Sequence, residues 1–134
     1  MSKLLRVSCA IILKENAVLC GQRSENMSHP LKWEFPGGKV EENELPEVTL
    51  HRELREELNI WVKIIDSLGS FRHRYSDKLE VELLPYVCNL MDGVLSANEH
   101  KEIRWVPINI LDNLDWVEAD IPIMLKFKTL YACF

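Results

Sequence analysis

The chain has 134 residues, of which 47% are hydrophobic and 28% are charged, and its formal net charge is −5. This length and composition predict a single globular domain over residues 1–134 and exclude an intrinsically disordered chain. The acidic balance argues against binding of a nucleic-acid polymer, which needs a basic surface, but it allows a small anionic substrate if divalent cations lie between the negative charges.

The first forty residues predict two strands, a loop and a sharp bend. Residues 3–14 and 17–22 are apolar and flank a turn signal at Glu15-Asn16, so we expect a strand that returns on itself. Residues 24–32 are polar and are expected to form a loop. The following segment, residues 33–40, contains Pro36-Gly37-Gly38, which predicts a break in the backbone direction.

The clearest helix is predicted over residues 46–59. Pro46 suits the first turn, and Glu47 suits the positive end of the helix dipole. Asn59 can end the helix because Asn tolerates the left-handed conformation required there. An apolar stripe recurs every four residues, at Leu50, Leu54 and Leu58, and is expected to pack on a sheet.

The second half of the chain predicts more strands and a closing helix. We expect strands over residues 61–74 and 78–90 around a turn at Ser76-Asp77, another turn at residues 91–93, and a short strand over residues 103–106. Residues 120–130 predict a helix with Asp120 as its N-cap and Pro122 in its first turn. Mixed strands with two separate helices favour a sheet packed between helices, an α/β arrangement.

The apolar runs and the cysteines indicate the cellular compartment of the protein. No stretch approaches the roughly 18 apolar residues of a membrane span, and residues 7–13 suit a buried strand better than a signal peptide. The four cysteines form no CxxC pair, and three of them lie in apolar runs. We therefore expect free thiols and a cytoplasmic protein.

The most informative feature is a group of acids on the predicted helix. At about 100° per residue, Glu53, Glu56 and Glu57 share a sector of roughly 100° that borders the leucine stripe. Crowded carboxylates raise one another's pKa, and a hard cation such as Mg²⁺ or Mn²⁺ relieves the repulsion. Arg52 is placed to hold one carboxylate through a bidentate contact. Taken alone, such a segment is more often a solvated, charge-laced helix face.

The spacing upstream of these acids resembles the Nudix box, G-x5-E-x7-R-E-U-x-E-E-x-G-U, in which U is aliphatic. The chain has Gly38, Glu44 and then residues 52–60, and it agrees at eight of the nine specified positions. The departure is Asn59 in place of Gly, at the position that ends the helix. The lead-in, residues 33–39, is similar to the MutT branch, and the similarity of element order covers nearly the whole chain.

This resemblance implies a Nudix α/β/α sandwich in which the box forms a loop–helix–loop. It implies a Mg²⁺-dependent hydrolase, with Mn²⁺ as an alternative. The implied metal-binding set comprises Gly37, Gly38, Glu53, Glu56, Glu57 and, from a late loop, Glu99. Glu53 and Glu56, supported by Arg52, are the implied catalytic residues, and Glu53, Glu56 and Glu99 are all candidates for the general base.

The implied substrate is a nucleoside triphosphate, cleaved to a monophosphate and pyrophosphate. Arg23 and Lys39 are candidates for phosphate or sugar contacts, and Phe35 is a candidate for a base contact. Asp120 occupies the place where MutT-like proteins read the base, and a carboxylate there accepts hydrogen bonds from amino groups of cytosine or guanine. A cytosine or oxidised guanine nucleotide is therefore favoured, in a role of nucleotide-pool sanitation.

Two other readings follow from the same residues. A Nudix hydrolase of another diphosphate would usually carry extra loops or domains. A Nudix-fold module that senses a nucleotide without cleaving it would usually lack box acids, whereas Glu53, Glu56 and Glu57 are all present. The preferred sugar and the oligomeric state are not indicated by the sequence.

Overall fold

The computed structural model describes residues 3–131. Its elements, in chain order, are β1 (Lys3–Lys14), β2 (Ala17–Gln22), β3 (Trp33–Glu34), β4 (Gly37–Lys39), α1 (Pro46–Leu58), β5 (Ile60–Ser67), β6 (Phe71–Ser76), β7 (Leu79–Gly93), β8 (Glu102–Pro107), the 3₁₀ helices η1 (Ile108–Asn113) and η2 (Glu118–Asp120), and α2 (Ile121–Tyr131).

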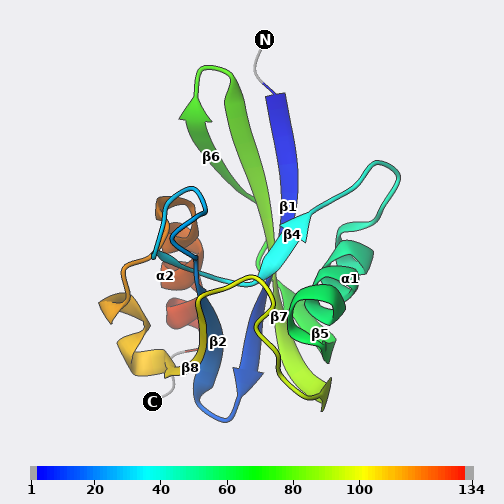
Figure 1. Ribbon diagram of the computed structural model, residues 1–134, viewed down its shortest axis with the longest axis vertical. Helices are drawn as coiled ribbons and strands as arrows, with labels where there is room; N and C mark the ends of the chain where they lie inside the picture. The colour runs from blue at the N-terminus through cyan, green and yellow to red at the C-terminus, as the bar shows by residue number, and fades with distance from the viewer. Residues whose placement is uncertain (1–2, 132–134) are drawn as a thin grey trace.

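The strands form one mixed sheet that lies between the two helices. β1 runs parallel to β7, and the other pairings are antiparallel, with β5 beyond β7 and with β3 and β8 both paired to β2. Figure 1 shows α1 on one side of the central strands and α2 on the other. The predicted α/β/α sandwich is therefore confirmed.

Alternation along β1 explains why both faces of the sheet are covered. Cys9 and Ile11 point into a core cluster that includes Ile123 and Phe127 of α2. Ala10 and Ile12, on the opposite face, point into a second cluster that contains the leucine stripe of α1. Side chains alternate along a strand, so a run that is apolar at every position needs a partner layer on each side.

The sheet opens along β1, and this opening places the glycine turn. β2 pairs with β1 only at Leu13 and Lys14. Farther along, β4 takes that edge, with Cys9 opposite Gly37 and Ser8 opposite Gly38. The bend predicted at Pro36-Gly37-Gly38 thus leads into a short strand that lies on β1 beside α1.

Helix α1 follows its prediction closely. Pro46 is at its start, and Asn59 caps its end in the left-handed conformation, with φ 58° and ψ 42°. The three leucines of the stripe are fully buried. The replacement of the family's glycine by Asn59 therefore leaves the end of the helix intact. No helix within residues 3–131 combines the length and the apolar character needed to cross a bilayer.

Two predictions in the second half of the chain are wrong. The strand expected over residues 61–74 is divided into β5 and β6, because Leu68-Gly69-Ser70 breaks it at Gly69, whose φ is +90°. The turn expected at residues 91–93 is part of β7, since Asp92 pairs with Trp61 and Gly93 with Ile60. The first strand is thus interrupted by a local break at Gly69, whereas at residues 91–93 pairing across the sheet overrides the local turn signal.

Candidate active site

Arg52 organises the acids at the start of the site. Its Nε and Nη2 donate to the two carboxylate oxygens of Glu44 at 2.9 and 3.0 Å, and its Nη1 donates to Glu53 at 3.0 Å. The hydrogen bonds from Arg52 and from the Thr49 hydroxyl lower the pKa of Glu44 to about 2. The bidentate contact of Arg52 was expected with one of the three helix acids, but its partner is Glu44, and Glu53 receives a single hydrogen bond.

Three carboxyl groups meet beside this arginine. The carboxyls of Glu53 and Glu99 both lie within hydrogen-bonding reach of Glu57, which is only 9% exposed. Burial, the contact with Glu53 and the charge of Glu99 together raise the pKa of Glu57 well above its ordinary value. The crowding inferred from the helix spacing is thus realised, and the late-loop acid Glu99 joins it.

Glu56 lies apart from this group. Its side chain is 61% exposed, and its carboxylate lies 3.5 Å from Nη1 of Arg52. Of the three helix acids predicted to share one sector, Glu57 is therefore directed into the site and Glu56 largely to solvent, with Glu53 between them.

The two glycines of the turn leave space that a side chain would fill. A Cβ atom on Gly37 would lie 2.0 Å from the carbonyl oxygen of Ser8, and one on Gly38 would lie 2.3 Å from Cδ of Glu53. Gly37 therefore lets β4 lie against β1, and Gly38 lets the Glu53 carboxyl pack on the turn. This contact sets the position of Glu53 relative to the backbone of the turn.

A cavity of about 680 Å³ adjoins these acids. Its walls come from strands β1, β3, β4, β6 and β7, from α1, and from the loops after β2, before β8 and before α2. Of the predicted site residues it brings together Arg23, Phe35, Gly37, Gly38, Glu57, Glu99 and Asp120. Lys39 is exposed and lines a separate shallow pocket with Arg6 and residues 41–45, so its predicted role stays a prediction.

The donor set fits a hard divalent cation. Carboxylate oxygens beside an open glycine backbone are the ligands that Mg²⁺ and Mn²⁺ prefer. Within residues 3–131, no three Asp, Glu, His or Cys side chains already form a cage of ligands.

Asp120 closes the far end of the cavity. It belongs to η2, and α2 begins at the next residue, Ile121. Its carboxylate accepts a hydrogen bond from the backbone N–H of Phe35 at 2.9 Å. Asp120 thus occupies the predicted N-cap position directly before α2, but its side chain bonds to the backbone that follows β3 instead of to the first turn of the helix. Burial raises the pKa of Asp120 to about 7, although the Phe35 bond opposes this change.

This pKa predicts how stability depends on pH. The folded-state pKa of Asp120 lies above the ordinary value of 3.8, so the folded protein holds a proton that the unfolded chain releases. As the pH rises from about 4 to 7, the free energy of unfolding should therefore fall by about 1.4 kcal/mol per pH unit relative to that of D120N. Denaturant unfolding of both proteins at several pH values measures this. A constant difference between them would contradict the assignment.

Sequence reasoning missed three residues that line the same cavity: Glu34, Tyr75 and His100. Glu34 accepts hydrogen bonds from Arg23 at 2.8 Å and from His100 Nε2 at 2.9 Å. Burial alone would raise the pKa of Glu34, but the contacts with His100 and Arg23 outweigh it and lower the pKa. The signal available was an acid between two aromatic residues, Trp33 and Phe35.

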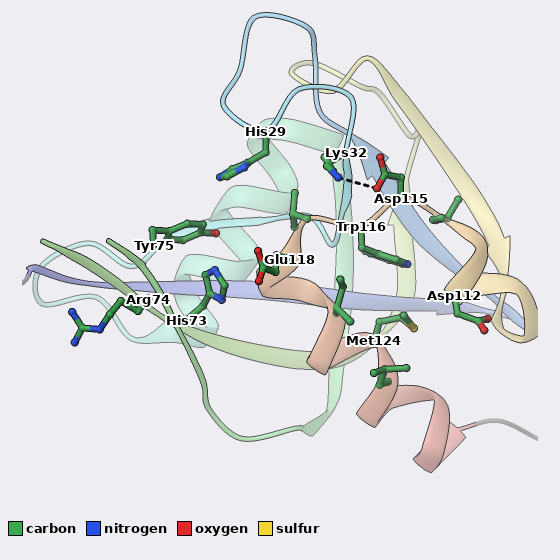
Figure 2. Close-up of a pocket in the computed structure, with 14 residues that line it drawn as sticks. His29, Lys32, His73, Arg74, Tyr75, Asp112, Asp115, Trp116, Glu118 and Met124 are labelled. Atoms are coloured by element: carbon green, nitrogen blue, oxygen red, sulfur yellow. Dashed lines mark hydrogen bonds and ion pairs between the residues drawn. The ribbon is translucent and has the colours of Figure 1, made fainter. Parts of the chain in front are cut away.

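A second cavity, of about 790 Å³, borders the first through His29, Tyr75 and Val117. Figure 2 shows His29 and Tyr75 at one end of it and Trp116 and Met124 at the other, with the Lys32–Asp115 ion pair at its edge. No acid of the α1 group lines it. Of these two cavities, only the smaller one is lined by Glu57 and Glu99.

Comparison with known proteins agrees with this geometry. The NUDIX domain model matches residues 3–127. The CTP pyrophosphohydrolase of Escherichia coli K12 is 32% identical over 130 residues, covering 97% of this chain and 96% of that protein. The 8-oxo-dGTP diphosphatase of the same organism is 28% identical, covering 96% and 99%.

Among solved structures, the solution NMR structure of the DNA mismatch repair protein MutT of methicillin-resistant Staphylococcus aureus 252 is 46% identical. It has a TM-score of 0.79 and covers 97% of this chain and 99% of its own. The family model, the full-length relatives, and the box acids gathered at a glycine turn beside a cavity all lead to one assignment. The chain belongs to the Nudix family, in its MutT-like branch.

Proposed function

We propose that the protein hydrolyses a nucleoside triphosphate to a nucleoside monophosphate and pyrophosphate, with Mg²⁺ as the cofactor and Mn²⁺ as an alternative. The observation that supports this proposal most strongly is the contact of the Glu53, Glu57 and Glu99 carboxyls beside Gly38. They lie at the edge of a cavity large enough for a nucleotide. The names of the two Escherichia coli relatives describe the same kind of reaction.

The reaction balances as a substitution at phosphorus. Water forms a bond to the β-phosphorus, the bridge to the α-phosphate breaks, and the monophosphate leaves. A bound divalent cation supplies charge neutralisation of the phosphate oxygens and a lower pKa for water. The chain contributes a carboxylate that accepts the proton of the water, from Glu53, Glu56 or Glu99. Arg52 keeps Glu53 in place for this task through its 3.0 Å hydrogen bond.

The cavity supports a substrate with an amino-bearing base. Asp120 is 5% exposed and lies in the wall together with Phe35 and Arg23. A protonated Asp120 donates a hydrogen bond, and an ionised Asp120 accepts one from an amino group. This favours a cytosine or oxidised guanine nucleotide, and we assign the protein to nucleotide-pool sanitation in the cytoplasm. Residues 1–134 form one domain in this proposal, without a nucleic-acid polymer as partner.

A panel of normal and oxidised triphosphates tests the proposal. Products are separated by chromatography after incubation with Mg²⁺ or with a chelator, and kcat/KM is compared across bases and sugars. We expect monophosphate and pyrophosphate in equal amounts, no turnover with chelator, and the highest kcat/KM for a cytosine or 8-oxoguanine nucleotide. Tight binding of a triphosphate without any product would favour the sensor alternative.

A further inference from the structure

The loop over residues 94–101, which carries Glu99, is fixed to α1 on one side. The backbone N–H groups of Ser96 and Asn98 donate to the carbonyls of Leu58 and Glu57 at 3.0 and 3.2 Å. The side-chain amide of Asn98 donates to the carbonyl of Glu56 at 2.9 Å. These are carbonyls of the last helical turn, which have no partner within the helix. The loop therefore caps the helix that carries the site acids.

On the other side, the loop is fixed to β2 and β3 through His100. Its side chain is 3% exposed, and its Nε2 lies 2.9 Å from Oε2 of Glu34. The next residue, Lys101, donates its backbone N–H to the carbonyl of Gln22 at 2.9 Å. Glu99 thus lies between two attachments, Asn98 on the helix and His100 on the sheet.

The imidazole of His100 fits against a strand position that has no side chain. A Cβ atom on Gly21 would lie 2.5 Å from Cδ2 and 2.7 Å from Nε2 of His100. Gly21 pairs with Glu34 across the sheet, so the same pair of residues provides both the space and the hydrogen-bond acceptor for the ring. Within residues 3–131, Nδ1 of His100 has no hydrogen-bond partner. The ring is therefore held by the Glu34 contact and by packing on Gly21.

We propose that His100 is a positioning residue for Glu99. The packing of its ring on Gly21 and its hydrogen bond to Glu34 hold the 94–101 loop in place, so that the Glu99 carboxyl contacts Glu57. This inference rests on the proposed function, because it assigns Glu99 to the cation site. Residues that orient a metal ligand commonly change metal affinity by about 10- to 100-fold when they are replaced. The position of Glu99 then depends on a contact outside the acidic group.

Amide hydrogen exchange and Mn²⁺ titration, both without nucleotide, test the proposal. In H100A we expect faster exchange at Lys101 and Asn98 in the metal-free protein, and Mn²⁺ binding weakened about 10-fold or more. H100Q keeps a donor near the position of Nε2 and should recover most of the affinity, whereas H100F keeps the ring but loses the donor and should not. Thermal unfolding of each variant establishes that it is folded.

Two double variants separate positioning from general destabilisation. G21A should displace the ring and resemble H100A, and G21A/H100A should bind Mn²⁺ no more weakly than H100A alone, since the clash is gone. Likewise, E99Q/H100A should match E99Q. Unchanged Mn²⁺ affinity in H100A, or additive losses in E99Q/H100A, would overturn the proposal.

Failure of the proposed function would be seen separately. It would appear as absent turnover in the wild-type protein, whereas amide exchange and Mn²⁺ affinity decide the role of His100 without any substrate.

Discussion

Replacing Glu53 by glutamine is expected to lower turnover of the triphosphate at least about 100-fold while the fold survives. The carboxylate contacts Arg52, Gly38 and Glu57, so it joins the arginine to the acidic group. Glutamine has nearly the same size but removes one negative charge and the capacity to accept a proton. Steady-state kcat in saturating Mg²⁺, together with thermal unfolding, measures the effect.

A matched change on the same helix serves as control. Glu47 lies in the first turn of α1, is exposed, and has a 3.4 Å contact with the hydroxyl of Tyr86. E47Q removes the same charge outside the acidic group and should keep kcat within about twofold of wild type, as expected for a surface change. If E53Q and E47Q were equally active, Glu53 would not belong to the catalytic site.

Alanine at the two adjacent glycines is expected to separate activity from stability. G38A places its Cβ 2.3 Å from Cδ of Glu53, and that side chain can move. Its main result should be a fall in kcat that approaches that of E53Q. G37A places its Cβ 2.0 Å from the carbonyl oxygen of Ser8 and 2.7 Å from Cα of Cys9, which are backbone atoms. Its main result should be a loss of about 1–3 kcal/mol in the free energy of unfolding.

Denaturant unfolding and kcat measured on both variants check this division. The two variants should differ because the atom that meets the new Cβ belongs to a movable side chain in G38A and to the backbone of β1 in G37A. A G38A protein with wild-type turnover would show that the Glu53 carboxyl need not pack on the turn. Equal stability of G37A and wild type would contradict the close approach of β4 to β1.

The parts that sequence predicted well are those fixed by local chemistry. The bounds of β1, β2 and α1 follow from apolar runs and from Pro46 and Asn59, which act on the backbone close to where they stand. The contact among the acids also follows, because residues 53 and 57 share one helix face and the spacing to Gly38 is fixed by the box. The free, buried state of Cys9, Cys20 and Cys88 is confirmed, whereas Cys133 lies outside the described residues.

The parts that sequence did not predict depend on contacts between distant segments. Glu34 is opposite Gly21 only because of the register between β3 and β2, and His100 bonds to Glu34 across 66 residues of sequence. Asp120 was predicted to cap the start of the last helix and to contact the base, but its hydrogen-bond partner, the backbone of Phe35, lies 85 residues earlier. No local propensity encodes such pairings, so the sequence alone indicates an N-cap role for Asp120 and gives no partner for His100.

Mn²⁺ titration of the wild-type protein and of E57Q, followed by electron paramagnetic resonance, tests the central claim most directly. Glu57 is the most buried acid of the group and touches both Glu53 and Glu99, so its carboxyl should hold the ion most strongly. We expect stoichiometric Mn²⁺ binding by the wild type, competition by Mg²⁺, and binding at least about 10-fold weaker in E57Q. A wild-type protein that binds no Mn²⁺, or that binds it as tightly as E57Q does, would contradict the account.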